Sequence, residues 1–275
     1  MIKLALLDLY DGFENQGMRG IRDIVARFSQ QSGLAIQITE YDVRQKNHLP
    51  DLSYDVYISS GGPGSPLDSA GEPWDDAYMA WLQQLDKWNK SSDSYPKKHA
   101  FFICHSFQLA CRYYQVGEVC KRKSTSFGIF PIHRLQAGST EPVFANLKDP
   151  FYAVDSRDFQ LIKPNHSRIK ELGGAILCIE KDRPHVPLER AIMAIRFNEY
   201  FIGTQFHPEA DAQGMAMYLR RQDKKETVIA NHGLPKWESM LEHLEDPDKI
   251  VFTQHQVLPN FLAMAVEQVV PVSLP

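Results

Sequence analysis

The sequence predicts an α/β fold in which a mostly parallel central sheet is covered by helices on both faces. Apolar runs at 3–10 and 100–104 each lead into a segment with helical periodicity. The run at 100–104 is wholly apolar, which is typical of a strand in the centre of a sheet. Because strands that alternate with helices pair in parallel through right-handed crossovers, this order predicts a layered α/β domain.

The first half of the chain supplies the alternation. After the first run, apolar residues recur at helical spacing from Met18 to Phe28, and Gly33 provides a stop. Strands are expected over 34–43 and 54–60, the latter ending in the glycine-rich stretch 61–64. A helix is expected over 73–90, where an aromatic stripe indicates core packing, and another from Phe107 onward.

The second half changes character. Short extended pieces predominate from about 123 to 162 and predict an antiparallel patch or insertion. Strand character returns at 176–181, 191–197 and 200–206, and helices are expected at 211–225, 235–245 and 257–270. We therefore expect one domain over 1–210 and a C-terminal helical extension over 211–275 packed on the same domain.

Composition excludes several function classes. Lys and Arg total 30 against 34 Asp and Glu, and no stretch forms a basic face, so we expect no nucleic-acid partner. The first apolar run is too short for a signal segment or a membrane span, which predicts a cytoplasmic protein without membrane attachment. The histidines and four cysteines lack metal-ligand spacing, so neither a metal nor a cofactor is expected.

Cys104 is the candidate nucleophile. An apolar strand that runs into a cysteine and then directly into a helix has the layout of a nucleophile elbow. The helix N-terminus presents free N–H groups and a positive dipole end, which favour the reactive thiolate. On strand position alone, a buried and inert cysteine is the more common alternative.

Two further stretches favour the catalytic interpretation. Gly61 and Gly62 follow a strand, so their unobstructed N–H groups could face an oxyanion formed on a substrate. His207 ends a late strand, with Pro208 stiffening the bend and Glu209 two residues on to orient the imidazole. In an α/β sheet these strand ends lie where ligands bind.

Three motifs carry a family resemblance. SGGPGS (60–65), FICHSFQLA (102–110) and GTQFHPE (203–209) resemble, in order and spacing, the signatures of class I glutamine amidotransferases. The resemblance covers about residues 1–210 and implies a flavodoxin-like three-layer fold. It further implies a catalytic triad of Cys104, His207 and Glu209. The oxyanion would be bound by backbone N–H groups of Gly61, Gly62 and His105. Gln108 would line the pocket for the glutamine part of the substrate.

The elbow departs from the family pattern at two positions. The family has glycine two residues before and two residues after the cysteine, where this chain has Phe102 and Ser106. Ser106 is small enough to let the helix approach the strand. Phe102 requires that the space beside the elbow be opened or filled differently.

The expected reaction is cysteine-dependent hydrolysis of the glutamine γ-amide through a γ-glutamyl thioester on Cys104, with no cofactor. A free-standing γ-glutamyl peptide or amide hydrolase and a catalytically silent binding module are the alternatives. The pattern most resembles stand-alone proteins similar to the glutaminase domain of GMP synthase. A separate ammonia-accepting synthetase is therefore a possible partner subunit. For the extension, the open alternatives are a cap over the pocket, a docking site for that partner and a homodimer contact.

Overall fold

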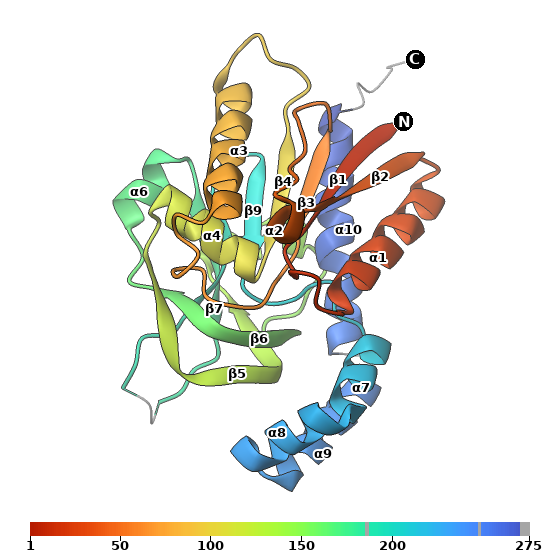
Figure 1. The fold of residues 1–275 in the computed structure, drawn as a ribbon, viewed down its shortest axis with the longest axis vertical. Coiled ribbons are helices and arrows are strands. Elements are labelled where there is room, and N and C mark those ends of the chain that lie inside the picture. Colours follow the sequence, from red (N-terminus) through yellow and green to blue (C-terminus); the bar gives the residue numbers. More distant parts are fainter. Residues whose placement is uncertain (185–186, 247–248, 270–275) are drawn as a thin grey trace.

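A nine-stranded sheet runs through the part of the chain that the computed structural model describes, residues 1–184, 187–246 and 249–269 (Figure 1). Its strand order is β2-β1-β3-β4-β9-β8-β6-β5-β7. The bounds are β1 (Ile2–Asp8), β2 (Ile36–Asp42), β3 (Val56–Ser59), β4 (His99–Ile103), β5 (Glu118–Arg134), β6 (Phe151–Ile162), β7 (Ala175–Glu180), β8 (Ile192–Arg196) and β9 (Phe201–Thr204).

Five neighbouring strands, from β2 to β9, pair in parallel. Ser59 lies opposite Phe102, and Ile103 lies opposite Thr204. The carboxyl ends of β3, β4 and β9 therefore reach the same edge of the sheet, as ligand-binding α/β sheets require. This half has the flavodoxin-like arrangement that the sequence predicted.

The other four strands are antiparallel. β8 pairs with β9 in antiparallel orientation, and β5 and β6 form a long ribbon whose register shifts between Lys121 and Ser126. The antiparallel patch expected over about 123–162 is thus confirmed. A mostly parallel sheet is not confirmed for the sheet as a whole, because parallel pairing stops at β9.

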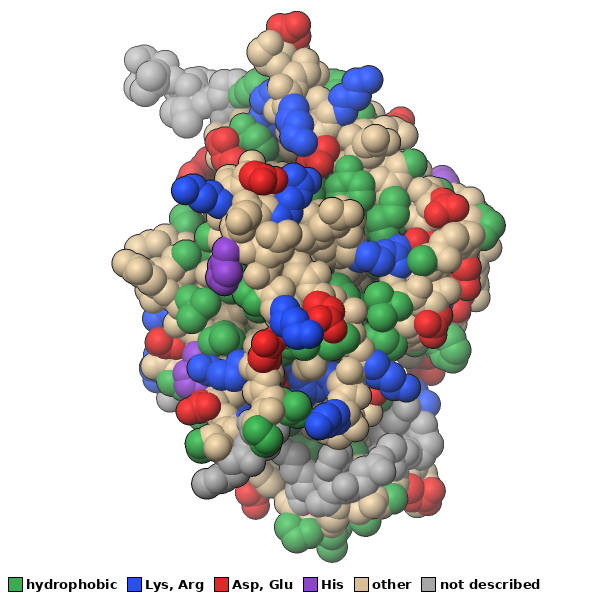
Figure 2. Space-filling model, turned by 90° about the vertical axis from the view of Figure 1, so that its left-hand side faces the viewer, with side chains coloured by type: hydrophobic (Ala, Val, Ile, Leu, Met, Phe, Trp, Pro, Cys, Tyr) green, Lys and Arg blue, Asp and Glu red, His purple; other side chains and the backbone are tan. Residues whose placement is uncertain are grey.

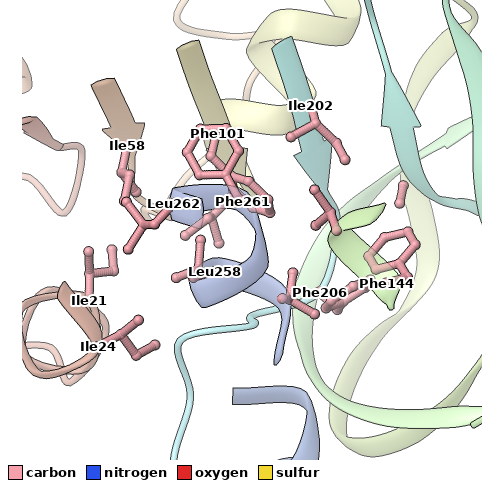
Figure 3. Close-up of a cluster of buried hydrophobic side chains, with 14 of the residues drawn as sticks. Ile21, Ile24, Ile58, Phe101, Phe144, Ile202, Phe206, Leu258, Phe261 and Leu262 are labelled. Carbon is pink, nitrogen blue, oxygen red and sulfur yellow. The ribbon is translucent and has the colours of Figure 1, made fainter. Parts of the chain in front are cut away.

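Helices cover both faces of the parallel half. α1 (Gly17–Ser32) and α10 (Ile250–Val269) lie on one face, where Ile21, Leu258 and Phe261 pack against Ile58 and Phe101 (Figure 3). α3 (Pro73–Lys90) and α4 (His105–Tyr114) lie on the other, and the aromatic stripe of α3 is buried there as predicted. Successive strand residues face opposite layers, which explains why the strands are apolar throughout.

The segment after β9 first leaves the sheet and then returns to it. α7 (Ala212–Arg220), α8 (Gln222–His232) and α9 (Leu234–Glu245) form a third apolar cluster with side chains of β5 and β6. The helix expected over 211–225 is divided at Arg221, and the last helix begins at Ile250, earlier than expected. Residues 247–248 and 270–275 of the expected extension lie outside the described residues.

Four short helices complete the described chain: α2 (Val43–Lys46), α5 (Gln136–Ser139), α6 (His166–Glu171) and the 3₁₀ turn η1 (Pro142–Phe144). On the face shown in Figure 2, basic and acidic side chains are interspersed. No helix among the described residues has the length and apolar character needed to cross a membrane.

Candidate active site

Cys104 lies at the carboxyl end of β4, where the chain turns into α4. Its backbone has φ 49° and ψ −97°, a conformation that costs energy for any residue with a side chain. The turn is held from both sides, because the Cys104 N–H donates to Thr204 O at 2.8 Å and its carbonyl accepts from the Gln108 N–H at 3.0 Å. α4 begins at His105, directly after Cys104 and two residues earlier than expected.

Phe102 fits beside the elbow because the neighbouring strand has a glycine there. Phe102 is fully buried and lies opposite Gly203 on β9. Its ring makes edge contacts with Phe197 and Phe201, at centroid separations of 6.0 and 6.2 Å. Phe102 replaces the glycine that the family has at this position of the elbow, and Gly203 on the neighbouring strand leaves the space that its side chain needs.

Ser106 tightens the elbow with its hydroxyl. Its Oγ accepts from the Ile103 N–H at 2.8 Å and lies 2.8 Å from Ser59 O, to which it can donate. These bonds connect the ends of β3 and β4 under the nucleophile. A serine here therefore does more than leave room for the helix.

His207 and Glu209 lie beside the sulfur on the segment that follows β9. The Nδ1 atom of His207 is 2.7 Å from Glu209 Oε1, and the carboxylate is buried. The His207 N–H donates to Val154 O on β6 at 2.8 Å, which holds the backbone of the histidine. With Nδ1 occupied, Nε2 is the ring nitrogen available to the thiol side.

The charges around His207 favour the imidazolium. Burial alone lowers the pKa of His207, but the negative charge of Glu209 and the charge and hydrogen bond of Cys104 outweigh it, so the pKa lies well above its ordinary value. The side chains of Glu209 and Cys104 therefore both stabilise the protonated form of His207.

The glycine loop after β3 passes so close to the site that side chains do not fit. A Cβ atom on Gly61 would be 2.9 Å from His207 Cε1 and 3.6 Å from Cys104 Cβ. One on Gly62 would be 2.3 Å from Leu9 O. The loop backbone at Gly61 thus lies directly against Cys104 and His207, as an oxyanion-binding role requires.

The side chain of His105 points into the protein core rather than serving as a second base. It is buried near Trp74, with the ring centroids 6.3 Å apart, and its Nε2 has no hydrogen-bond partner. Burial, followed by the charges of Arg44 and Arg112, lowers its pKa to about 3. Only the backbone N–H of His105 is suitable for the predicted oxyanion role.

Gln108 is connected to the nucleophile through a residue that the sequence analysis missed. Its Nε2 donates to Gln205 Oε1 at 3.1 Å and to Phe159 O at 3.3 Å. Gln205 Nε2 in turn lies 3.6 Å from Cys104 Sγ. Gln205 belongs to the third motif, two residues before His207, and that position was the available signal.

Tyr10 is a second residue that sequence reasoning missed. A Cβ on Gly61 would be 3.3 Å from its hydroxyl oxygen, and a Cβ on Gly17 would be 2.2 Å from that oxygen and 3.2 Å from Glu209 Oε1. Burial, then the charges of Glu209 and Cys104, raise the pKa of Tyr10 well above its ordinary value. The phenol is therefore held neutral beside the three predicted catalytic residues.

These residues surround a cavity of about 400 Å³. Cys104, His105, Gln108, His207 and Glu209 all line it, as does Gly62, and Gly61 adjoins them. The cavity also reaches α7, which contributes Met215 and Tyr218. His166, a surface residue of α6, is not among the lining residues.

In the described part of the chain no group of three or more acidic, histidine or cysteine side chains could hold a metal ion.

Comparisons with known proteins show the family of the chain. The model of the class I glutamine amidotransferase family matches residues 6–223. The chain therefore belongs to the class I glutamine amidotransferase family. The match extends past the predicted boundary at 210 and includes α7. No curated protein matches the sequence significantly.

Solved structures share the fold at low sequence identity. A glutamine amidotransferase from Thermotoga maritima has a TM-score of 0.68 at 14% identity, over 97% of this chain and 98% of that one. A candidate GMP synthase subunit from Thermoplasma acidophilum has a TM-score of 0.55 at 13% identity, over 97% and 94%. The glutaminase domain of a Trypanosoma brucei CTPS, with bound acivicin, has a TM-score of 0.54 at 12% identity, over 76% and 86%.

Proposed function

We propose that the protein hydrolyses the γ-amide bond of glutamine or of a γ-glutamyl amide, with Cys104 as nucleophile, His207 as acid and base, and Glu209 orienting the imidazole. The observation that carries this proposal is the linked arrangement of Glu209, His207 and Cys104 at the rim of one cavity. Its three members come from two distant strand ends, and each is the residue type that the chemistry needs.

The first half-reaction forms a γ-glutamyl thioester. The Cys104 thiolate attacks the carbonyl carbon of the γ-amide, and the carbonyl π electrons move to the oxygen, which the N–H groups of Gly61, Gly62 and His105 would stabilise. As the C–N bond breaks, Nε2 of His207 gives its proton to the departing nitrogen. Ammonia, or an amine, leaves.

The second half-reaction releases glutamate. Neutral His207 takes a proton from water, and the resulting hydroxide equivalent attacks the thioester carbon. The C–S bond breaks, which restores the thiolate beside an imidazolium. Glu209 holds Nδ1 throughout, so the same nitrogen faces the reacting atoms in both steps. Gln108 would contact the glutamyl part of the substrate.

The direct test compares two cysteines. Cys104→Ala should abolish glutamate release from glutamine and from a γ-glutamyl dipeptide, whereas Cys111→Ala should retain it, because Cys111 is buried in α4 away from the cavity. A glutamine-like diazoketone should label Cys104 in the wild-type protein. Absence of turnover and of labelling would instead support a silent binding module with the same fold.

The acceptor of the released nitrogen is a separate matter. If glutamine is the substrate, an ammonia-accepting synthetase would be the natural partner. The fold shared with a candidate GMP synthase subunit is compatible with that role. Co-purification from cell extract, with glutamine hydrolysis measured before and after addition of the partner, would test it.

A further inference from the structure

The direction in which the leaving group departs is set by His207. Its Nδ1 is bound to Glu209, so Nε2 must protonate the departing nitrogen. The backbone of His207 bridges to Val154 on β6. Any substituent on the amide nitrogen would therefore start beside His207 and Val154.

That part of the cavity has an apolar wall, formed by Val154 on β6 and Met215 on α7, with Phe127 and Tyr218 beside them. Val154 and Met215 belong to one buried cluster. The rings of Phe127 and Tyr218 lie 5.5 Å apart and tilted. An alkyl or aromatic group would lose little by leaving water here, whereas a charged group would meet no counter-charge among these four residues.

A second part of the site is polar. Gln108 and Gln205 connect there through their amides, and Gln205 reaches the sulfur. The substrate is thus expected to lie with its glutamyl part near these amides and its nitrogen substituent near the apolar wall. Neutral amides can recognise the glutamyl group without excluding a bulky substituent beside the apolar wall.

The apolar wall is fixed in place rather than loosely attached. Arg19 on α1 donates two hydrogen bonds from Nη2 to the carboxylate of Asp211, at 2.7 and 2.8 Å. Asp211 is also the N-cap of α7, accepting from the Gly214 N–H at 2.6 Å. α7 is therefore anchored at its first turn, and the wall is present before a ligand binds.

Both arginines that line the cavity are already paired. Arg19 is held by Asp211 and Asp23, and the buried Arg157 binds Asp155 through Nε at 2.8 Å. Neither is left as a receptor for a second carboxylate, such as that of a γ-glutamyl peptide. A volume of about 400 Å³ lies in the range of pockets that hold molecules larger than a single amino acid.

From these observations we infer that the preferred substrates are γ-glutamyl amides of apolar or aromatic amines, and that Val154, Met215, Phe127 and Tyr218 form the subsite for the amine. This inference rests on the proposed hydrolysis at Cys104. It assigns a specificity role to the first helix of the C-terminal extension, and it makes ammonia from free glutamine a minor product.

The test compares three substrates on the full-length wild-type protein, with kcat/KM obtained from glutamate release. γ-Glutamylbenzylamide should exceed γ-glutamylglycine and glutamine by about tenfold or more, since burying an apolar group in a fitted pocket gives discrimination of this order. A higher kcat/KM for glutamine or for γ-glutamylglycine would overturn the inference and leave the hydrolase proposal intact. If none of the three is hydrolysed and Cys104 is not labelled by the diazoketone, both proposals fail.

Two methionines on one helix provide a matched pair of variants. Met215→Asn should lower kcat/KM for the benzylamide about tenfold while glutamine stays within about twofold, because Met215 lines the cavity. Met217→Asn should change neither, since Met217 is 54% exposed and outside the lining. Equal loss on all substrates in a Met215→Asn protein with wild-type thermal unfolding would contradict the subsite.

Discussion

Phe102 and Gly203 lie directly opposite each other on β4 and β9, so the large side chain of Phe102 requires a small residue at position 203. A Cβ atom on Gly203 would be 3.2 Å from Phe102 Cβ and 2.8 Å from the ring of Phe107. The large residue before the nucleophile is tolerated because its partner strand has no side chain at this point.

Gly203→Ala should therefore be costly. The added methyl overpacks the space between β4, β9 and α4, which typically costs about 1–3 kcal/mol. Urea unfolding would measure this loss. Gly203→Ala combined with Phe107→Leu should recover part of the stability, because the closest contact is with the Phe107 ring. Strict additivity of the two changes would argue against the proposed crowding.

Glu209→Gln should lower kcat/KM by about three to four orders of magnitude, because the amide can hold the imidazole in the wrong tautomer and no longer stabilises its charged form. Activity against glutamine and a γ-glutamyl amide would be measured. Glu40→Gln, which alters a half-exposed ion pair with Arg22 on the surface, is the control and should retain activity.

The same variant has a predicted pH signature in stability. The pKa of His207 is raised in the folded protein, so the imidazolium contributes stability that is fully present below the ordinary value of 6.5 and is lost as pH rises through the folded pKa. The destabilisation caused by Glu209→Gln should be largest below pH 6.5 and shrink at higher pH. Denaturant unfolding at several pH values checks the sign, and a difference that grows with pH would refute it.

Tyr10→Phe should reduce kcat by about tenfold and leave KM nearly unchanged. The substitution keeps the ring and removes only the neutral O–H beside Cys104 and Glu209. Steady-state kinetics across pH would show whether the hydroxyl acts on the reacting groups. Tyr41→Phe removes a hydroxyl that bonds Tyr54 outside the cavity and should be silent in the assay.

His99 should make the protein acid-sensitive. It is fully buried at the start of β4, neither ring nitrogen has a hydrogen-bond partner, and burial, followed by the charge of Arg196, lowers its pKa to about 4. Below pH 6.5 His99 binds a proton in the unfolded chain but stays neutral in the folded chain. The free energy of unfolding therefore falls by about 2 kcal/mol between pH 6.5 and 5.

His99→Phe should flatten this dependence. Chemical unfolding at pH 8 and pH 5 would compare the variant with wild type, the difference between the two pH values being the relevant quantity. His166→Asn, on the exposed surface of α6, should leave it unchanged. A wild-type slope retained in His99→Phe would assign the acid sensitivity to other groups.

Much of the fold follows from local patterns. The strand at 100–104, the aromatic stripe of 73–90 and the antiparallel character of 123–162 were all readable from apolar spacing, and the structure has each of them. Helix ends were less predictable. The break at Arg221 and the early start at Ile250 depend on packing against β5, β6 and the sheet face, which spacing alone does not contain.

The candidate site shows the same division. Cys104, His207 and Glu209 could be singled out because each follows a predicted strand within a distinctive motif, and strand ends of a parallel sheet share one edge. Tyr10 and Met215 carry no such signal, and Gln205 was missed although it belongs to the third motif. Tyr10 lines the cavity from the loop after β1, Met215 lines it from α7, and Gln205 reaches the sulfur through its side-chain amide.

By itself, the sequence determined the family, the layered α/β architecture and the residues that meet at the end of β4, since motifs and short-range periodicity are local properties. Only the tertiary structure decided how Phe102 fits opposite Gly203, which partners surround the sulfur, and that α7 forms a wall of the cavity. These features arise from contacts between segments far apart in the chain, and long-range packing leaves no periodic trace in the residues that make it.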